Sequence, residues 1–330
     1  MNYNDILATN ARALVASPKG ILAIDESTET CTKRFEKLGI PSTLETRRAY
    51  REMIITTPDI EHYVSGMIMV EETFNQTTAD QKSFLELFKE KGMLPGIKVD
   101  QGLEVYKGKE KITKGLDGLA DRLQKYKNDG AVFAKWRAVF RISDTTPTDE
   151  LIAENTIRLT RYAKQCQEVG LVPIVEPEIL MDGNHDIERT EKIVSDILDV
   201  LFVRLNQAEV YLPGLLLKTG LVEPGIDAPK ESVEKVAEMT IRCFVDYVPN
   251  TIGGIILLSG GLDAESVNSY LNAMHTEKLP WPLTFSFGRA IQNDALTLWA
   301  SDMTKVKEAQ ALLLQRAQES SAASIGKYGQ

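Results

Sequence analysis

The sequence predicts an α/β fold, in which eight parallel strands close into a barrel within one domain. Short apolar runs recur roughly every 30 to 45 residues, which is the spacing of strand–helix units in a parallel sheet. The runs are continuous rather than alternating, as expected for strands that are covered on both faces. Amphipathic stretches lie between the runs, and no linker divides the chain. This repetition favours a closed (β/α)8 or TIM barrel over an open sheet.

The eight apolar runs give the predicted strands in chain order, and each is followed by a polar or glycine-rich turn. We expect strands at residues 20–24, 64–70, 95–99, 131–140, 171–175, 214–217, 253–258 and 283–287. The residues up to about Lys19 precede the repeat and are expected to form an N-terminal helical extension. The domain is expected to span 1–330, with the barrel at about 20–300 and a C-terminal helix and flexible tail at about 303–330.

The helices are clearest in the second half of the chain. In the segment 149–169, apolar residues such as Ile152 and Leu159 recur at helical spacing, with Thr148 as the expected N-cap and Gly170 as the stop. The same pattern predicts helices at 187–205, 231–245 and 304–318. These apolar stripes indicate core-facing helices rather than a cofactor site.

Composition excludes several classes of function. The net charge of −9 argues against a nucleic-acid surface or a polybasic membrane anchor. No apolar run approaches the roughly 20 residues that a membrane span needs, and the polar N-terminus lacks a secretory signal. The 3 cysteines form no CxxC pair, and the 3 histidines show no zinc-binding spacing. We therefore expect a soluble cytoplasmic protein without a metal or cofactor.

Charged residues follow almost every predicted strand. Because chemistry in a barrel collects at the carboxyl ends of the strands, these side chains are expected to share one mouth. A single lysine at such a position is more often a surface ion pair than a nucleophile. A cluster of lysines, arginines and carboxylates is costly to bury without a ligand, which favours a site. The members are Asp25, Lys98, Asp100, Lys135, Arg137, Glu176, Glu178 and Lys218.

A buried lysine among these residues is a candidate nucleophile. Lys218 follows three leucines of a predicted strand. An ammonium group in an apolar setting loses hydration and its pKa falls, so that a free amine exists near neutral pH and attacks carbonyl carbons. Lys98 and Lys135 also lie at strand ends, and spacing alone does not choose among the three lysines.

The last two predicted strands are followed by loops suited to phosphate. Ser259-Gly260-Gly261 comes after the seventh strand and Gly288-Arg289 after the eighth. Glycine permits close approach of the backbone, and arginine binds phosphate with two parallel hydrogen bonds. These loops are also the usual phosphate position in a barrel. A second basic group, Lys33-Arg34 with Lys98, is a candidate for another phosphate or for a solvated helix face.

Seven motifs, in order along nearly the whole chain, resemble the class I, Schiff-base fructose-1,6-bisphosphate aldolases. The motifs are GILAIDEST at 20–28, GIKVD at 96–100, FAKWR at 133–137, VPIVEPE at 172–178, LLK at 216–218, LSGG at 258–261 and FSFGRA at 285–290. The resemblance implies the barrel fold and the reversible cleavage of fructose 1,6-bisphosphate to dihydroxyacetone phosphate and glyceraldehyde 3-phosphate. It also implies a homotetramer.

The resemblance assigns roles to individual residues. The imine-forming lysine of the family matches Lys218, and the lysine that assists proton transfer matches Lys135. Glu176 matches the general acid/base, and Asp25 matches the carboxylate beside the substrate's C4 hydroxyl. Tyr328 corresponds to the tail tyrosine that protonates the enamine, although it is third from last here rather than last.

The same match implies the binding residues of a sugar bisphosphate. One phosphate is expected at Ser259, Gly260, Gly261, Ser286, Gly288 and Arg289, and the other end of the substrate at Ser27, Thr30, Arg34 and Lys98, with further contacts from Arg137 and Glu178. The sequence departs from the family pattern after Lys218, where Thr219-Gly220 stands in place of proline and asparagine.

Two alternatives to a fructose-bisphosphate aldolase remain open. One is an aldolase of the same mechanism that prefers sedoheptulose 1,7-bisphosphate or fructose 1-phosphate, because the loop after Lys218 differs. A non-catalytic sugar-phosphate-binding scaffold is the other, but a binding module has no need of an imine lysine with acid/base partners. Glycolysis, gluconeogenesis and the Calvin cycle all use the reaction, so the sequence does not give the pathway direction.

Overall fold

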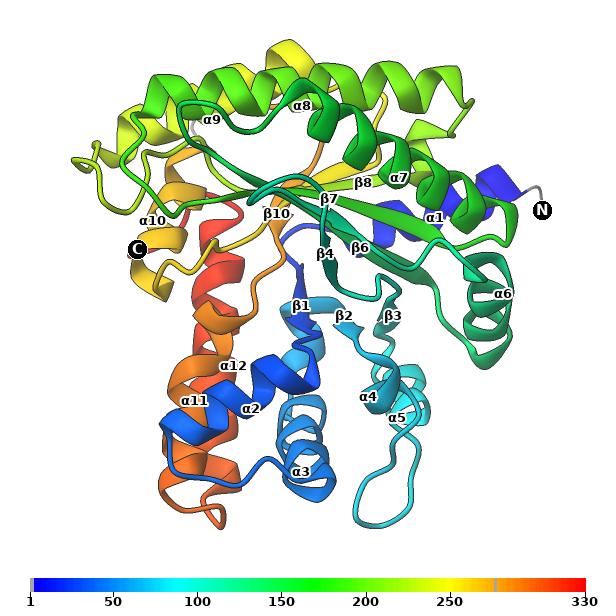
Figure 1. Ribbon diagram of the computed structural model, residues 1–330. Coiled ribbons are helices and arrows are strands. Elements are labelled where there is room, and N and C mark those ends of the chain that lie inside the picture. Colours follow the sequence, from blue (N-terminus) through cyan, green and yellow to red (C-terminus); the bar gives the residue numbers. More distant parts are fainter. Residues whose placement is uncertain (1–2, 276–277) are drawn as a thin grey trace.

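A computed structural model, which describes residues 3–275 and 278–330, confirms the barrel. Eight parallel strands form one sheet in the order β1-β2-β3-β6-β7-β8-β9-β10 (Figure 1). The backbone N–H of Ala23 donates to the carbonyl oxygen of Phe287 at 2.8 Å, which joins the first strand to the segment after the last one. The strands are β1 (Gly20–Ile24), β2 (Val64–Met69), β3 (Leu94–Lys98), β6 (Phe133–Arg141), β7 (Val172–Leu180), β8 (Leu216–Thr219), β9 (Gly254–Leu257) and β10 (Leu283–Phe285).

All eight predicted runs form strands, and β7 differs most from its predicted length. It continues past Val175 to Leu180, because it stays paired with β6 as far as Arg141. The apolar run ends where Glu176 begins, so the sequence pattern hides this extension. The carboxylates at the end of β7 therefore stand on regular strand rather than on a loop.

Helices surround the sheet, with α7, α8 and α9 along one side and α2, α3, α11 and α12 along another (Figure 1). Thr148 caps α7 as predicted, accepting a hydrogen bond from the backbone N–H of Leu151. Ser232 caps α9, which therefore begins two residues later than predicted. The helices are α1 (Tyr3–Leu14), α2 (Thr28–Lys37), α3 (Leu44–Ile55), α4 (Glu71–Phe74), α5 (Phe84–Lys91), α6 (Leu119–Asp129), α7 (Asp149–Glu168), α8 (Ile187–Gln207), α9 (Val233–Tyr247), α10 (Ala264–Ala273), α11 (Arg289–Ser301) and α12 (Val306–Ala323), with 3-10 turns η1 (Ile60–His62) and η2 (Leu212–Gly214).

Two further features differ from the sequence prediction. A short antiparallel hairpin, β4 (Leu103–Val105) with β5 (Lys111–Thr113), follows β3 and was not predicted, because three-residue strands leave little periodicity to detect. Helix α12 continues to Ala323, beyond the predicted end at Gln318. Ser320 and Ser321 are buried there, so tertiary packing extends a helix that their polarity had argued against.

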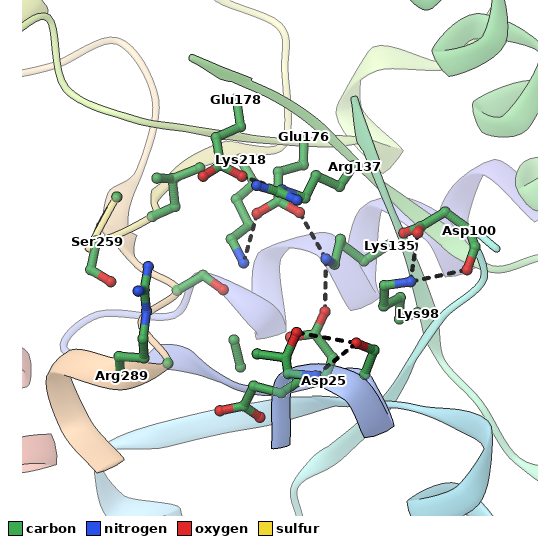
Figure 2. Close-up of a pocket in the computed structure, with 18 of the residues that line it drawn as sticks. Asp25, Lys98, Asp100, Lys135, Arg137, Glu176, Glu178, Lys218, Ser259 and Arg289 are labelled. Carbon is green, nitrogen blue, oxygen red and sulfur yellow. Dashed lines mark hydrogen bonds and ion pairs between the residues drawn. The ribbon is translucent and has the colours of Figure 1, made fainter. Parts of the chain in front are cut away.

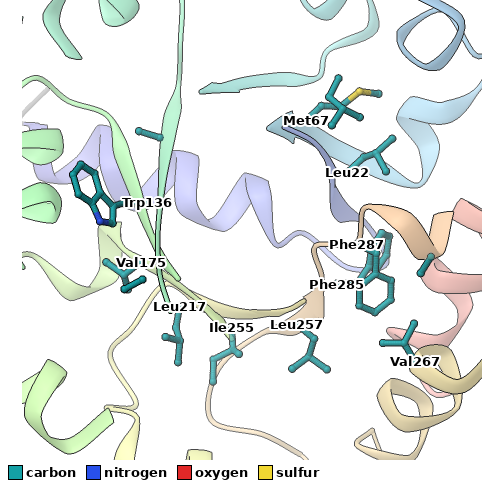
Figure 3. Packing of buried hydrophobic residues seen from close by; sticks show 14 of the residues in the cluster. Leu22, Met67, Trp136, Val175, Leu217, Ile255, Leu257, Val267, Phe285 and Phe287 are labelled. Carbon is teal, nitrogen blue, oxygen red and sulfur yellow. The ribbon is translucent and has the colours of Figure 1, made fainter. Parts of the chain in front are cut away.

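The outward-facing strand residues form the main hydrophobic core. Leu22, Met67, Trp136, Val175 and Leu217 point away from the barrel axis and pack beneath the helices (Figure 3). All five are buried. Because successive side chains in a strand alternate between faces, their neighbours point into the barrel.

The inward-facing residues form a second, smaller apolar cluster at the amino ends of the strands. Phe133 fills the interior there, and a Cβ placed on Gly96 would lie 2.1 Å from its ring. Helix α1 closes this end, since Leu7 and Ala11 belong to the same cluster. A Cβ on Gly214 would lie 2.6 Å from Leu7, so the glycine lets the helix approach closely.

None of the helices in the described part of the chain combines the length and the apolar character that a bilayer span requires.

Candidate active site

Strand alternation delivers the charged side chains to the other end of the barrel. In β6 the interior residue Phe133 is followed two positions later by Lys135, and in β7 Ile174 is followed by Glu176. An inward-facing position remains inward-facing two residues on, so the polar residues continue the interior stack. The same step leads from Leu216 to Lys218 in β8. The inward-facing side chains thus change from apolar to charged within two residues along each of these strands.

These side chains line a cavity of about 540 Å³ at the carboxyl ends of the strands (Figure 2). Every predicted site residue lines it except Gly261 and Tyr328. The predicted members that it brings together are Asp25, Ser27, Thr30, Arg34, Lys98, Lys135, Arg137, Glu176, Glu178, Lys218, Ser259, Gly260, Ser286, Gly288 and Arg289.

Three buried charged side chains and the partly buried Asp25 alternate in sign at the base of the cavity. Lys135 Nζ lies 2.7 Å from Asp25 Oδ2 and 2.8 Å from Glu176 Oε2, while Lys218 Nζ lies 3.0 Å from Glu176 Oε1 (Figure 2). Lys135 and Lys218 are each 3% exposed. Among the residues that the structure describes, Glu176 Oε2 has no well-aligned hydrogen-bond partner, so its contact with Lys135 is a charge pair. Two cations and two anions cancel here, which makes their burial tolerable.

The mutual charges outweigh burial in setting the protonation states. Burial acts to raise the pKa of Asp25, but Lys135 and Lys218 hold that pKa well below its ordinary value. Burial likewise acts to raise the pKa of Glu176, and the same two lysines lower it. Burial acts to lower the pKa of Lys135, yet Asp25 and Glu176 raise it. Near neutral pH, Lys135 is therefore an ammonium between two carboxylates.

Further ion pairs hold the rim of the cavity. The Lys98 ammonium bonds to the Asp100 carboxylate and, at 3.0 Å, to the Asp100 carbonyl oxygen. The Arg137 guanidinium pairs with Glu178. Burial acts to lower the pKa of Arg137, but Glu178 raises it, so this cation is permanent. Each of these rim cations is thus held in place by a neighbouring carboxylate.

The start of α2 contributes polar groups on the other side of the mouth. Ser27 caps this helix, and its Oγ lies 3.1 Å from Thr30 Oγ1. Arg34 pairs with Glu26, which also accepts a hydrogen bond at 2.9 Å from the buried Arg51. Sequence reasoning missed Glu26 as a site residue. Its position directly after Asp25 was the available signal, but the partner Arg51 lies in a distant helix.

The loop after β9 and the start of α11 form an anion-binding corner. Gly260 and Gly261 have φ values of +57° and +100°, which residues that carry a side chain rarely adopt. Arg289 begins α11, and a Cβ on Gly261 would lie 3.3 Å from its Nη2 atom. Ser286 Oγ is buried without a hydrogen-bond partner within the described residues. A helix N-terminus, an arginine and an unpaired hydroxyl suit a phosphate.

Tyr328 lies away from this cavity. Its backbone N–H donates to Asn272 Oδ1 of α10 at 2.8 Å, and its ring packs against the main core. Burial, followed by nearby carboxylates such as Glu319, raises the pKa of its hydroxyl. A catalytic role for Tyr328 stays a prediction.

One group of potential metal ligands occurs in the described residues. Asp59, Glu61 and His62 at η1 each place a ligand atom within 4.8 Å of the others. Asp59 and His62 are exposed, and none of the three lines the large cavity. Exposed acidic clusters of this kind are frequent without an ion, so we assign them no role.

Comparison with known proteins identifies the family. The family model for glycolytic fructose-bisphosphate aldolase class I matches residues 6–330. A probable fructose-bisphosphate aldolase class 1 of Xanthomonas campestris is 47% identical over 327 residues, covering 98% of both chains. Cytosolic fructose-bisphosphate aldolase 5 of Arabidopsis thaliana is 45% identical over 330 residues, covering 99% of this chain and 92% of that one.

Solved structures agree with the sequence relatives. The fructose-bisphosphate aldolase of Plasmodium falciparum, crystallised with TRAP and a small-molecule inhibitor, is 40% identical and superimposes with a TM-score of 0.98. The match covers 100% of this chain and 97% of that one. With the lysine–carboxylate network at the barrel mouth, these matches show that the chain belongs to the class I fructose-bisphosphate aldolases.

Proposed function

We propose that this chain is a lyase that reversibly cleaves fructose 1,6-bisphosphate to dihydroxyacetone phosphate and glyceraldehyde 3-phosphate through an imine on Lys218. The observation that carries the proposal is the contact between Lys218 Nζ and Glu176 Oε1 at 3.0 Å in a buried setting. Glu176 accepts a proton from the Lys218 ammonium, and the free amine attacks the C2 ketone. Family membership and the names of the relatives support the substrate.

Glu176 and Asp25 carry out different steps of the remaining proton transfer. After the amine adds to C2, the carbinolamine hydroxyl leaves as water with a proton from Glu176, and a protonated imine remains. The proton of the C4 hydroxyl passes to Asp25, the C3–C4 bond breaks, and its electrons flow into the imine to give an enamine. Lys135 stays charged between both carboxylates and stabilises them. Protonation of the enamine at C3 and addition of water release dihydroxyacetone phosphate.

The two ends of the substrate are expected to bind on opposite sides of Lys218. We place one phosphate at the corner formed by Ser259, Gly260, Gly261, Ser286, Gly288 and Arg289. The other lies toward Ser27, Thr30, Arg34 and Lys98, with Arg137 and Glu178 between. The unpaired buried hydroxyl of Ser286 supports the first position.

Trapping the imine tests this function. The protein is incubated with fructose 1,6-bisphosphate, reduced with borohydride and digested, and the adduct is located by mass spectrometry. We expect it on Lys218; an adduct on Lys98 or Lys135 alone, or none, would overturn the mechanism. Parallel assays with sedoheptulose 1,7-bisphosphate and fructose 1-phosphate rank the substrates by kcat/KM.

The enzyme is further proposed to act in the cytoplasm as a homotetramer. The names of plant relatives, which include cytosolic isozymes, support the location. Light scattering coupled to size-exclusion chromatography measures the assembly, and a monomeric mass would contradict the tetramer. Deleting residues 328–330 tests Tyr328, because loss of an enamine-protonating group slows turnover more than cleavage.

A further inference from the structure

Glu223 lies against the loop that is proposed to bind a substrate phosphate, on the side away from the cavity. It belongs to the segment between β8 and α9. A Cβ placed on Gly260 would lie 3.9 Å from Glu223 Oε1. The carboxyl group helps to line a cavity of about 10 Å³, whose wall includes Ser259 and Gly260. These two residues also line the large cavity, so one thin loop separates Glu223 from the phosphate position.

The loop therefore has opposite charges on its two flanks. Arg289 approaches Gly261, where a Cβ would lie 3.3 Å from Nη2, while Glu223 approaches Gly260. Glycine offers no side chain to separate these groups from the bound anion. A phosphate dianion at this corner is attracted by Arg289 and is repelled by Glu223 when the latter is ionised.

Few charges compensate Glu223. Lys230, on its own segment, is the cation that acts on it, and no ion pair of Glu223 occurs within residues 3–275 and 278–330. Tyr270 of α10 faces Glu223. The pKa of the Tyr270 hydroxyl is raised by burial and then by the charges of Glu223 and Asp263. β7 and the loop after it contribute Ile179 and Met181 to the wall of the small cavity, and neither side chain carries a charge. Burial, partly offset by Lys230, raises the pKa of Glu223 to about 7.

We propose that Glu223 is a positioning residue of the phosphate corner, which must be protonated for the glycine loop to hold a phosphate dianion tightly, so that substrate binding takes up a proton from solvent. The proposal rests on the proposed function, because it assumes a phosphate at this loop. It adds a residue that touches neither the substrate nor Lys218 and acts through Gly260. Its consequence is an apparent affinity that falls as the pH rises through neutrality.

The test compares steady-state kinetics of the wild type, Glu223→Gln and Asp227→Asn between about pH 6 and about pH 8.5. Glutamine mimics the protonated carboxyl group. Asp227 is an exposed acid on the same segment and supplies a control with the same change of charge. We expect KM for fructose 1,6-bisphosphate to rise about tenfold over this pH range in the wild type and in Asp227→Asn. In Glu223→Gln the rise in KM should be smaller by a factor of about three. The change falls on KM rather than kcat.

Inhibition by sulfate removes the titration of the substrate phosphate from the comparison, because sulfate remains a dianion over this range. The inhibition constant of sulfate should rise with pH in the wild type and stay constant in Glu223→Gln. A constant value in the wild type, or equal pH dependence of the wild type and Glu223→Gln, overturns the proposal. The wild-type measurement stands even where the variant folds poorly.

Borohydride trapping of the wild type and of Glu223→Gln distinguishes failure of the role proposed for Glu223 from failure of the imine mechanism. An adduct on Lys218 together with unchanged pH profiles disproves the role of Glu223 and leaves the aldolase mechanism intact. Absence of the adduct from the wild type disproves the mechanism itself.

Discussion

The two ends of the barrel interior use the same strands for opposite purposes. At the amino ends, Phe133, Ile174 and Leu216 pack with α1 into an apolar plug. Two residues further along each strand, Lys135, Glu176 and Lys218 are as deeply buried but carry charge. The plug is stabilised by burial of apolar surface, whereas the charged end depends on each ion having its partner. Stability and chemistry are therefore separable along a single strand.

The largest expected effect is at the nucleophile. Lys218→Met should lower kcat by about 10⁴-fold or more, because no other group forms the imine. The melting temperature should also fall, since Glu176 Oε1 loses its partner and only the contact of Oε2 with Lys135 remains. Kinetics and thermal denaturation measure the two quantities. Lys307→Met on the exposed face of α12 is the matched control and should behave as wild type; substantial activity in Lys218→Met would contradict the assignment.

Phe133→Ala removes a large side chain from the apolar end of the barrel interior. The ring lies over Gly96, where no side chain exists to fill the space it leaves. We expect a loss of about 4 kcal/mol in the free energy of unfolding, measured by urea denaturation. The folded fraction should still form the Lys218 adduct. A loss below about 1 kcal/mol would show that the plug rearranges to fill the gap.

Lys135→Met is the matched change at the charged end, two residues from Phe133. We expect kcat to fall by about 10² to 10³-fold. Lys135 holds the pKa values of Asp25 and Glu176 down, so its removal raises both. Activity should then disappear at a higher pH on the acid side than in the wild type. A pH–rate profile checks this, and an unshifted acid limb would rule out Lys135 as their main counter-ion.

The smallest effect concerns stability at Glu223. Its pKa is raised from 4.5 to about 7 in the folded chain, so its stabilising contribution is complete below about pH 4.5 and is lost as the pH rises through 7. From pH 5 to pH 8 this group should cost about 2 kcal/mol, discounted for partial exposure. Glu223→Gln should lack this decline in urea denaturation. Parallel pH dependence in both proteins would contradict the raised pKa.

The sequence predicted the barrel and most of the cavity, because both follow from strong local patterns. Each predicted strand contains an apolar run, and a charged residue near the carboxyl end of a strand, such as Lys218 in β8, indicates the mouth of the barrel. Residue patterns left three lysines equivalent, and only the family resemblance distinguished Lys218.

What the sequence did not predict depends on contacts between distant segments. Glu26 acquires its place from Arg51, and Glu223 from the fold of the loop at Gly260. The end of α12 depends on burial of serines that are unremarkable as sequence. Local periodicity carries no information on such pairings.

Closure of the barrel by α1 has a consequence for biosynthesis. The helix is made first, yet Leu7 and Ala11 pack beside Gly214 and Gly253, which are made more than 200 residues later. During translation its apolar face therefore lacks the packing against Gly214 and Gly253 until most of the barrel has been synthesised. Such long-range contacts also slow folding of the completed chain. We expect nascent chains that end before β8 to bind chaperones through this helix.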